Sequence, residues 1–183
     1  RQVSLLLKRS PGRDAYPGDI FFLHSRLLER AAKLHNKLGG GSITALPVAS
    51  TIGGDVSEYI ITNLMSITDG HIFLDVNMMN SGIFPAVNSG LSVSRIGGAV
   101  QCPLHRKVGE LASRQMARYN EVKSFETINT EVSEDTLRDI RRGKRVMEMF
   151  SQATGFNLHT DEQVILMAVV TSGRIDTMEL EEM

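Results

Sequence analysis

Residues Asn88 to Gln101 read NSGLSVSRIGGAVQ, and this stretch lies where the pattern of the chain changes. Helical and β-rich signals alternate before it, whereas three helical segments follow one another after it. Within the stretch, Arg95 is the one charged residue among small and apolar neighbours, and charges seldom lie in such company without a partner. The residues alone leave two interpretations open: Arg95 forms a buried ion pair, or it binds an anion that another molecule supplies.

The residues before this stretch predict an α/β layer with a largely buried sheet. Asp19 is expected to cap a helix, whose apolar residues recur at helical spacing: Ile20, Leu23, Leu27, Ala31 and Leu34. The glycines Gly39 to Gly41 are expected to end that helix, and residues 42–50 follow as a β-rich run. Asp55 is expected to cap a short helical turn, and Asp69-Gly70 predicts a hairpin within residues 64–75.

The residues after the stretch predict a helical subdomain, with a boundary near residues 98–105. We therefore expect two domains, residues 1–102 and residues 103–183. The helical segments read VGELASRQMARYNEVKSF, SEDTLRDIRRGKRVMEMF and TDEQVILMAVV. The acidic residues after Ser133 suit the dipole at a helix start, and Thr160 to Gln163 has the form of a capping box.

Composition excludes some classes of function. Twenty basic and twenty-one acidic residues give a net charge of −1, which argues against a general binder of nucleic acid or of membrane surfaces. No stretch approaches the roughly 20 apolar residues of a membrane span. Cys102 is the one cysteine; it cannot form an internal disulfide and is expected to be a small packing residue.

Several catalytic motifs are absent from the sequence. There is no GxxxxGK[ST] loop, no GxGxxG and no GxSxG. The triple glycine lacks the lysine and hydroxyl that hold phosphate and magnesium. The five histidines have no zinc-type spacing and are expected to be surface or hydrogen-bonded residues. Composition and spacing alone therefore indicate no self-contained active site.

Four segments resemble the alpha subunits of F-type ATP synthases. They read RQVSLLLKRSPGRDAYPGDIFFLHSRLLERAAKL, GGGSITALPV, TNLMSITDGHIFLD and GIFPAVNSGLSVSRIGGAVQ. The likeness runs nearly from Arg1 to residue 101 and continues more weakly to residue 176. The catalytic beta subunits of these enzymes have a different sequence after their PAV segment, so the alpha type is preferred. The resemblance implies the second part of a RecA-like nucleotide-binding domain, followed by an α-helical C-terminal subdomain.

The resemblance also implies a role for Arg95. In this family the alpha subunit contributes an arginine finger to the catalytic nucleotide site of a neighbouring beta subunit, and SVSR matches that motif. A guanidinium supplied by a neighbour stabilises the negative charge that phosphoryl transfer spreads over the terminal phosphate. The family further implies that serine is needed here, at Ser92 and Ser94. The chain would perform no chemistry alone.

The family's phosphate loop and acidic magnesium-binding segment lie upstream of the residue that matches Arg1. We therefore expect a companion chain with the N-terminal part of alpha, or a chain that is itself a fragment. Half a parallel sheet would expose backbone edges and apolar faces, so stable folding alone is not expected. ATP or ADP with Mg²⁺ would be held mainly by partner chains, and none by this chain alone.

The second nucleotide site of the family, which is non-catalytic, is altered in this sequence. Phe84 stands where the family usually has an arginine. Gln152 is kept from a Gln-x-Gln-Tyr pattern, whereas Thr154 and Gly155 replace its later residues. Because a cation and a stacking aromatic are lost, nucleotide contacts from this part are expected to be weak or absent. Gln152 remains the candidate contact.

The resemblance implies beta subunits and the gamma subunit of the central stalk as partners, in proton-driven ATP synthesis. It implies no nucleic acid, and membrane contact only through the complex. The expected location is the matrix side of the mitochondrial inner membrane, with the cytoplasmic side of a bacterial plasma membrane as the alternative. A scaffold subunit without catalytic contribution is the rival interpretation. A related hexameric nucleic-acid motor is disfavoured by the neutral charge and the lack of a basic, aromatic-rich stripe.

Overall fold

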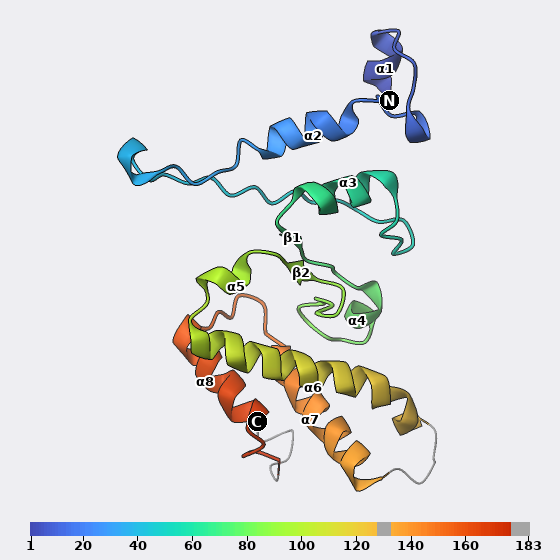
Figure 1. The fold of residues 1–183 in the computed structure, drawn as a ribbon. Coiled ribbons are helices and arrows are strands. Elements are labelled where there is room, and N and C mark those ends of the chain that lie inside the picture. The colour runs from blue at the N-terminus through green and yellow to red at the C-terminus, as the bar shows by residue number, and fades with distance from the viewer. Residues whose placement is uncertain (128–132, 177–183) are drawn as a thin grey trace. The chain divides into compact units, whose positions relative to one another are not determined.

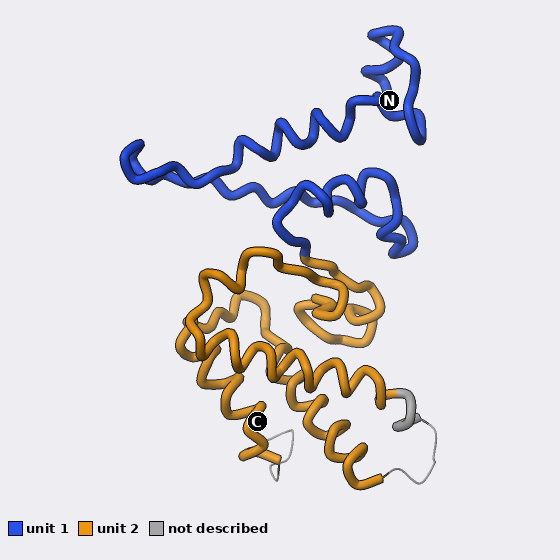
Figure 2. Tube along the Cα trace, in the orientation of Figure 1, with its two compact units in different colours: residues 1–71 blue, residues 72–183 orange. Residues whose placement is uncertain are grey.

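The computed structural model describes residues 1–127 and 133–176. It divides into two compact units, Arg1–His71 and Ile72–Met183, which Figure 2 distinguishes by colour. The domain boundary expected after residue 102 lies inside the second unit. In that unit Arg106 donates a hydrogen bond to the carbonyl oxygen of Gly98, so the residues before and after the expected boundary contact each other.

The first unit is built from short elements (Figure 1). In chain order they are α1 (Gln2–Leu6), the 3-10 helix η1 (Arg13–Ala15), α2 (Ile20–Leu28), the 3-10 helix η2 (Asn36–Leu38), α3 (Tyr59–Ile67) and β1 (Gly70–His71). Ile61 of α3 is buried, but most large apolar side chains of this unit are exposed, Leu46 and Ile52 by 82% and 81%. Apolar surface on this scale indicates a unit that lacks part of its packing.

The first predicted helix is shorter than its apolar periodicity suggested. Helix α2 ends at Leu28, so the extension to Leu34 was wrong. Beyond α2, Leu34 donates its backbone N–H to Gly41, and Ile43 donates to Ala32. These longer-range bonds take the backbone groups that a continued helix would have used.

The glycine and β-rich predictions in the same region need a similar correction. Gly39 has a φ of 94° and closes the 3-10 helix η2, not α2. Residues 42–50 form no strand; only Ser42 makes an isolated bridge, to Lys33. Asp19 precedes α2 without capping it through its side chain, because its carboxylate pairs with Arg9 at 3.2 Å.

The hairpin predicted around Asp69-Gly70 is also not formed. Ile61, Leu64 and Met65 lie in α3, where their spacing of three and four residues suits a helix better than a strand. Of the predicted pair, Gly70–His71 alone is a strand. Asp55 does accept a hydrogen bond from the Ser57 N–H, at 2.8 Å, in the loop before α3.

The second unit begins with a loop-rich segment and ends in three long helices (Figure 1). Its elements are α4 (Val76–Asn80), β2 (Val93–Ser94), α5 (Gly97–Val100), α6 (Pro103–Thr127), α7 (Glu134–Phe150) and α8 (Thr160–Thr171). The sequence thus predicted these last three helices correctly. The largely buried sheet was wrong for the described residues, because β1 is half-buried and β2 is exposed.

The core of the second unit lies between α6, α7 and α8. Its buried side chains are Ala112, Met116, Tyr119, Ile140, Val146, Met149 and Val170. Gly143 of α7 lies directly against the ring of Tyr119, where an added Cβ would collide with it. Small and large residues therefore interlock at the crossing of α6 and α7.

The ends of these helices show how local sequence starts them. Ser133 accepts the Thr136 N–H at 3.3 Å and caps α7, whose first turn holds the two acidic residues expected there. The cap of α8 is His159, one residue earlier than predicted, and its N–H donates to Glu162 at 2.8 Å. Cys102 is exposed, not packed in a core, and its sulfur accepts the His105 N–H at 3.4 Å where α6 begins.

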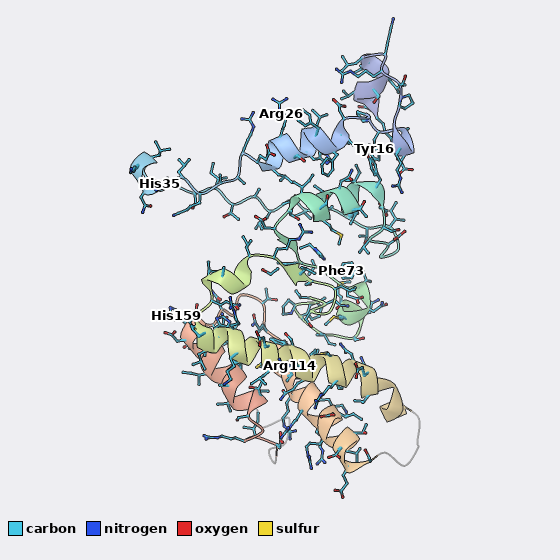
Figure 3. The ribbon with its side chains drawn as sticks, in the orientation of Figure 1. Tyr16, Arg26, His35, Phe73, Arg114 and His159 are labelled. Carbon is cyan, nitrogen blue, oxygen red and sulfur yellow. The ribbon has the colours of Figure 1, made fainter. Side chains whose placement is uncertain are left out.

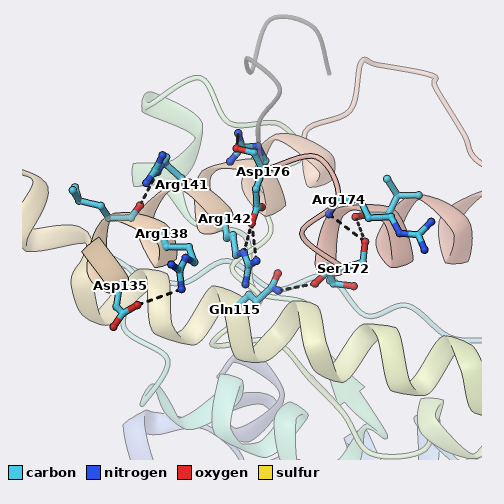
Figure 4. Close-up of polar contacts among 12 residues, drawn as sticks. Gln115, Asp135, Arg138, Arg141, Arg142, Ser172, Arg174 and Asp176 are labelled. Carbon is cyan, nitrogen blue, oxygen red and sulfur yellow. Dashed lines mark hydrogen bonds and ion pairs between the residues drawn. The ribbon is translucent and has the colours of Figure 1, made fainter. Parts of the chain in front are cut away.

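Polar contacts also tie the helices together (Figure 4). Arg142 of α7 donates from Nε and Nη2 to one carboxylate oxygen of Asp176, at 2.8 and 2.6 Å. Gln115 of α6 donates to the carbonyl oxygen of Thr171, at 3.1 Å. In the described part of the chain, no helix combines the length and the apolar character needed to cross a membrane.

Candidate functional site

Arg95 follows β2 directly and precedes α5, and it is exposed. The interpretation of Arg95 as a buried ion pair therefore does not fit the structure. Its neighbours Val93 and Ile96 are exposed as well, by 47% and 61%. A guanidinium in this position is accessible to a phosphate or a carboxylate on another molecule. We call residues 88–98 the arginine loop.

Ser94 shapes the bend that follows Arg95. Its Oγ accepts the N–H of Gly97 at 3.0 Å, as a hydroxyl does at a helix start. A Cβ at Gly97 would lie 2.5 Å from that Oγ, closer than real contacts allow. The bend therefore requires both the serine hydroxyl and the bare glycine.

Ser92 connects the arginine loop to the strand-like segment before α4. Its Oγ donates to the carbonyl oxygen of Asn88 at 2.7 Å and accepts the N–H of Phe73 at 3.0 Å. Phe73 is labelled in Figure 3. The hydroxyl thus acts as donor and acceptor at once, and Ser92 holds the loop in place from within the protein.

Asn88 and Asp75 complete this support, and sequence analysis did not identify either of them. Asn88 Nδ2 donates to Asp75 Oδ2 at 3.1 Å, while Asp75 Oδ1 accepts the N–H of Asn77 at 2.9 Å. The backbone N–H of Asn77 and then the Asn88 amide lower the pKa of Asp75 from its ordinary value of 3.8. The NSG turn that starts at Asn88 was the available signal, because Asn commonly bonds to the backbone two residues on.

A second contact holds the far end of the arginine loop. Arg106 of α6 donates from Nη2 to the carbonyl oxygen of Gly98. A Cβ at Gly98 would approach the same nitrogen to 3.4 Å, so the guanidinium lies close against the backbone. The loop is therefore tied on both sides of Arg95.

Gln152 belongs to a different contact. Its backbone N–H donates to the carbonyl oxygen of Phe84 at 2.7 Å, and both residues are exposed. The structure thus brings together Phe84 and Gln152. In the sequence analysis, Phe84 departs from the pattern expected for the non-catalytic nucleotide site and Gln152 keeps it. Gly155, further along the same loop, has a φ of 81°, a conformation that suits glycine.

A metal ion finds no ready set of ligands in residues 1–127 and 133–176. There, His, Cys, Asp and Glu side chains form no group of three or more that could hold one. The groups that hold the arginine loop are backbone, hydroxyl and amide groups, the Asp75 carboxylate and the Arg106 guanidinium. Its chemistry is that of an exposed, positioned guanidinium.

Comparisons with known sequences match two family models to the chain. The model of the "ATP synthase alpha/beta family, nucleotide-binding domain" matches residues 1–94. That of the "ATP synthase alpha/beta chain, C terminal domain" matches residues 101–183.

The chain is also similar to three curated bacterial proteins, each named ATP synthase subunit alpha. Those of Staphylococcus haemolyticus and Macrococcus caseolyticus are 48% identical over 182 residues, and that of Lawsonia intracellularis is 48% identical over 181 residues. The matches cover 99–100% of this chain but 36% of each relative. The chain thus spans about a third of the length of these relatives.

Proposed function

We propose, for a chain that belongs to the ATP synthase alpha/beta family, that it acts as the C-terminal part of a non-catalytic alpha subunit in a rotary F-type ATP synthase. In this role Arg95 is an arginine finger at the ATP-forming site of an adjacent beta subunit. The observation that carries the proposal is the exposure of Arg95 on a loop held on both sides by Ser92, Ser94 and Arg106.

The chemistry of this role follows from the guanidinium. It stays protonated and offers a planar fork of donors that matches two phosphate oxygens. Donors aimed at the place where charge develops lower the barrier most when they are already held in position. ATP or ADP and Mg²⁺, bound mainly by partner chains, would supply the reacting phosphate; this chain's own residues would orient Arg95 and nothing more.

The exposed apolar surface of the first unit supports a companion segment. Phe22, Leu46 and Ile52 are 58%, 82% and 81% exposed, and such surface costs roughly 25 cal/mol for each Å² left in water. We propose that the N-terminal part of an alpha subunit covers this surface. The relatives contain such additional length, because they are matched over only 36%.

The proposed partners are beta subunits, which alternate with alpha subunits in a ring, and the gamma subunit of the central stalk. The complex would be associated with a membrane and drive ATP synthesis with protons. All three relatives are bacterial, so the bacterial alternative is favoured and the mitochondrial location has no support among them.

We propose further that nucleotide contacts from Gln152 are weak. Its hydrogen bond to Phe84 uses the backbone. Phe84 stands where a cation would be needed, and Thr154 and Gly155 stand where the pattern has its later glutamine and its stacking aromatic ring. A nucleotide held by Gln152 and its neighbours in the assembled complex would contradict this.

The test of the main proposal uses the assembled complex. Arg95→Ala should leave assembly intact and lower multisite ATP turnover by about 10³-fold or more, the scale on which arginine fingers act. Arg95→Lys should recover little of it, because a point charge does not replace the planar fork. The control is Arg114→Ala, which removes an exposed arginine of α6 that is labelled in Figure 3.

The outcomes separate the finger from the rival scaffold role. Unchanged turnover of Arg95→Ala in an intact complex would reject the finger. A loss of turnover in Arg114→Ala of the same size would show that removing any exposed arginine disturbs the complex. A loss confined to Arg95 would exclude a purely structural subunit.

A further inference from the structure

Asn88 has each of its polar groups engaged at the base of the arginine loop. Its N–H donates to the Phe73 carbonyl at 2.9 Å, and its own carbonyl accepts the Ser92 hydroxyl at 2.7 Å. In the side chain, Oδ1 accepts the N–H groups of Gly90 and Leu91 at 3.0 and 3.2 Å, while Nδ2 donates to Asp75.

Asp75 is engaged in a complementary way. One carboxylate oxygen accepts the Asn77 N–H at 2.9 Å at the start of α4, and the other accepts the Asn88 amide at 3.1 Å. Its backbone N–H donates to Ala86 at 2.9 Å. Each member of the pair thus uses one oxygen for its own turn and the remaining side-chain atom for the other member.

The path from this pair to Arg95 is short. Ser92 binds the Asn88 carbonyl and lies three residues before Arg95, with the two residues of β2 between them. Because β2 is exposed and only two residues long, it cannot by itself fix the direction of the guanidinium. The hydrogen bonds of Ser92 before the strand add rigidity of the kind that a longer, buried strand would give.

We propose that Asn88, oriented by Asp75, is a positioning residue that sets where Arg95 points. The inference rests on the proposed function of Arg95. Reacting groups must be held closely, and a displacement of about 1 Å can cost about 100-fold in rate. In this role the pair acts on turnover through the direction of Arg95.

The chemistry of the pair allows a swap. Asn88→Asp places two carboxylate oxygens opposite each other. Asp75→Asn has one oxygen for two donors, so if that oxygen stays on the Asn77 N–H, its NH₂ group faces the NH₂ group of Asn88. Each single variant therefore loses one hydrogen bond. The double variant restores it in reverse, with the amide at position 75 donating to the carboxylate at position 88. Each side chain keeps an oxygen for its own backbone partners: the N–H groups of Asn77, Gly90 and Leu91.

The experiment measures kcat and KM for ATP hydrolysis in the assembled complex. Each single variant should lower kcat by about 10- to 100-fold, with KM changed less than threefold, and the double variant should return kcat to within about threefold of the original. Asn80→Asp, an exposed residue at the end of α4, is the matched control and should leave kcat unchanged.

A second arm repeats Asn88→Asp in an Arg95→Ala background. If Asn88 acts through Arg95, Asn88→Asp should not lower kcat further in this background. A general structural defect would lower kcat by the same factor as Asn88→Asp does when Arg95 is present. Such an equal, independent loss of kcat would overturn the positioning role of Asn88, whereas the proposed arginine-finger role of Arg95 would still stand. If Arg95→Ala alone leaves turnover unchanged, the proposed function itself fails.

If the single variants assemble poorly, kcat of the assembled double variant provides the test. Once assembled, a double variant with kcat near the original supports the positioning role. A double variant that assembles fully but keeps the low kcat of a single variant overturns it.

Discussion

The backbone N–H of Gln152 donates to the carbonyl oxygen of Phe84 across 2.7 Å. This bond joins the loop between α7 and α8 to the loop that leads into the arginine loop. Because the bond uses only main-chain atoms, any residue other than proline at position 152 can make it. It separates the structural role of position 152 from any contact that its side chain makes.

That separation leads to a first prediction. Gln152→Ala keeps the hydrogen bond and should leave ATP turnover and bound nucleotide within about twofold. Gln152→Pro removes the donor and should weaken the loop contact by about 1 kcal/mol. Ser151 tolerates a following proline, because its φ of −74° and ψ of 127° are already extended. Hydrogen exchange of both loops in the complex measures the difference, and equal protection in the two variants would contradict it.

A second prediction concerns the bend after Arg95. Gly97→Ala places a Cβ 2.5 Å from Ser94 Oγ and should displace that hydroxyl. With Arg95 as the proposed finger, turnover should fall about tenfold or more, since this bend directly follows Arg95. Gly41→Ala is the control, because an added Cβ there meets no atom within 4 Å. The two variants are compared in steady-state ATP hydrolysis, and equal activities would rule out the bend as a determinant.

Third, the crossing of α6 and α7 should not tolerate a side chain at Gly143. Alanine there collides with Tyr119, and overpacking of this kind costs about 1–3 kcal/mol. Gly109→Ala in α6, where an added Cβ meets nothing within 4 Å, should instead be neutral or stabilise by up to about 1 kcal/mol. Urea unfolding monitored by exchange of α6 and α7 peptides distinguishes them. A stabilising Gly143→Ala would refute this packing.

The fourth prediction compares two ion pairs of α7 (Figure 4). Arg142 and Asp176 are 32% and 27% exposed and lie 2.6 Å apart; the hydrogen bond to Asp176 raises the pKa of Arg142. Asp176→Asn should cost about 1–3 kcal/mol, because the partly buried guanidinium loses its charged acceptor. Asp135→Asn should cost under about 0.5 kcal/mol, because its pair with Arg138 is exposed. Thermal unfolding measures the loss of stability in both variants. Equal shifts in melting temperature would contradict the larger cost predicted for Asp176→Asn.

A fifth prediction concerns pH. The hydrogen bonds from Asn77 and Asn88 lower the pKa of Asp75 below 3.8, so its carboxylate stabilises the folded loop at all pH values above 3.8. That contribution is lost as the pH falls through the lowered folded pKa. Asp75→Asn should therefore remove a part of the acid sensitivity of residues 73–92. The test is amide hydrogen exchange of residues 73–92 at several acidic pH values, corrected for its intrinsic pH dependence. Identical pH profiles for the original protein and Asp75→Asn would disprove the prediction.

The helices α6, α7 and α8 could be read from the sequence because their signals are local. Apolar residues at helical spacing and the Ser133 cap act within a few residues, and even the misplaced cap of α8 lies only one residue from its predicted position. Arg95 could also be selected as a candidate from the sequence, because its uncharged neighbours and the SVSR motif are adjacent to it in the chain.

Tertiary structure alone decided the rest. Helix α2 stops at Leu28 because Ala32 and Leu34 bond to residues beyond Gly40, and the base of the arginine loop is held by Asp75, which lies 13 positions from its partner Asn88. Backbone donors and amide side chains have many possible partners within reach in an unfolded chain. Only the folded backbone selects one of them, so contacts of this kind leave no periodic trace in the sequence.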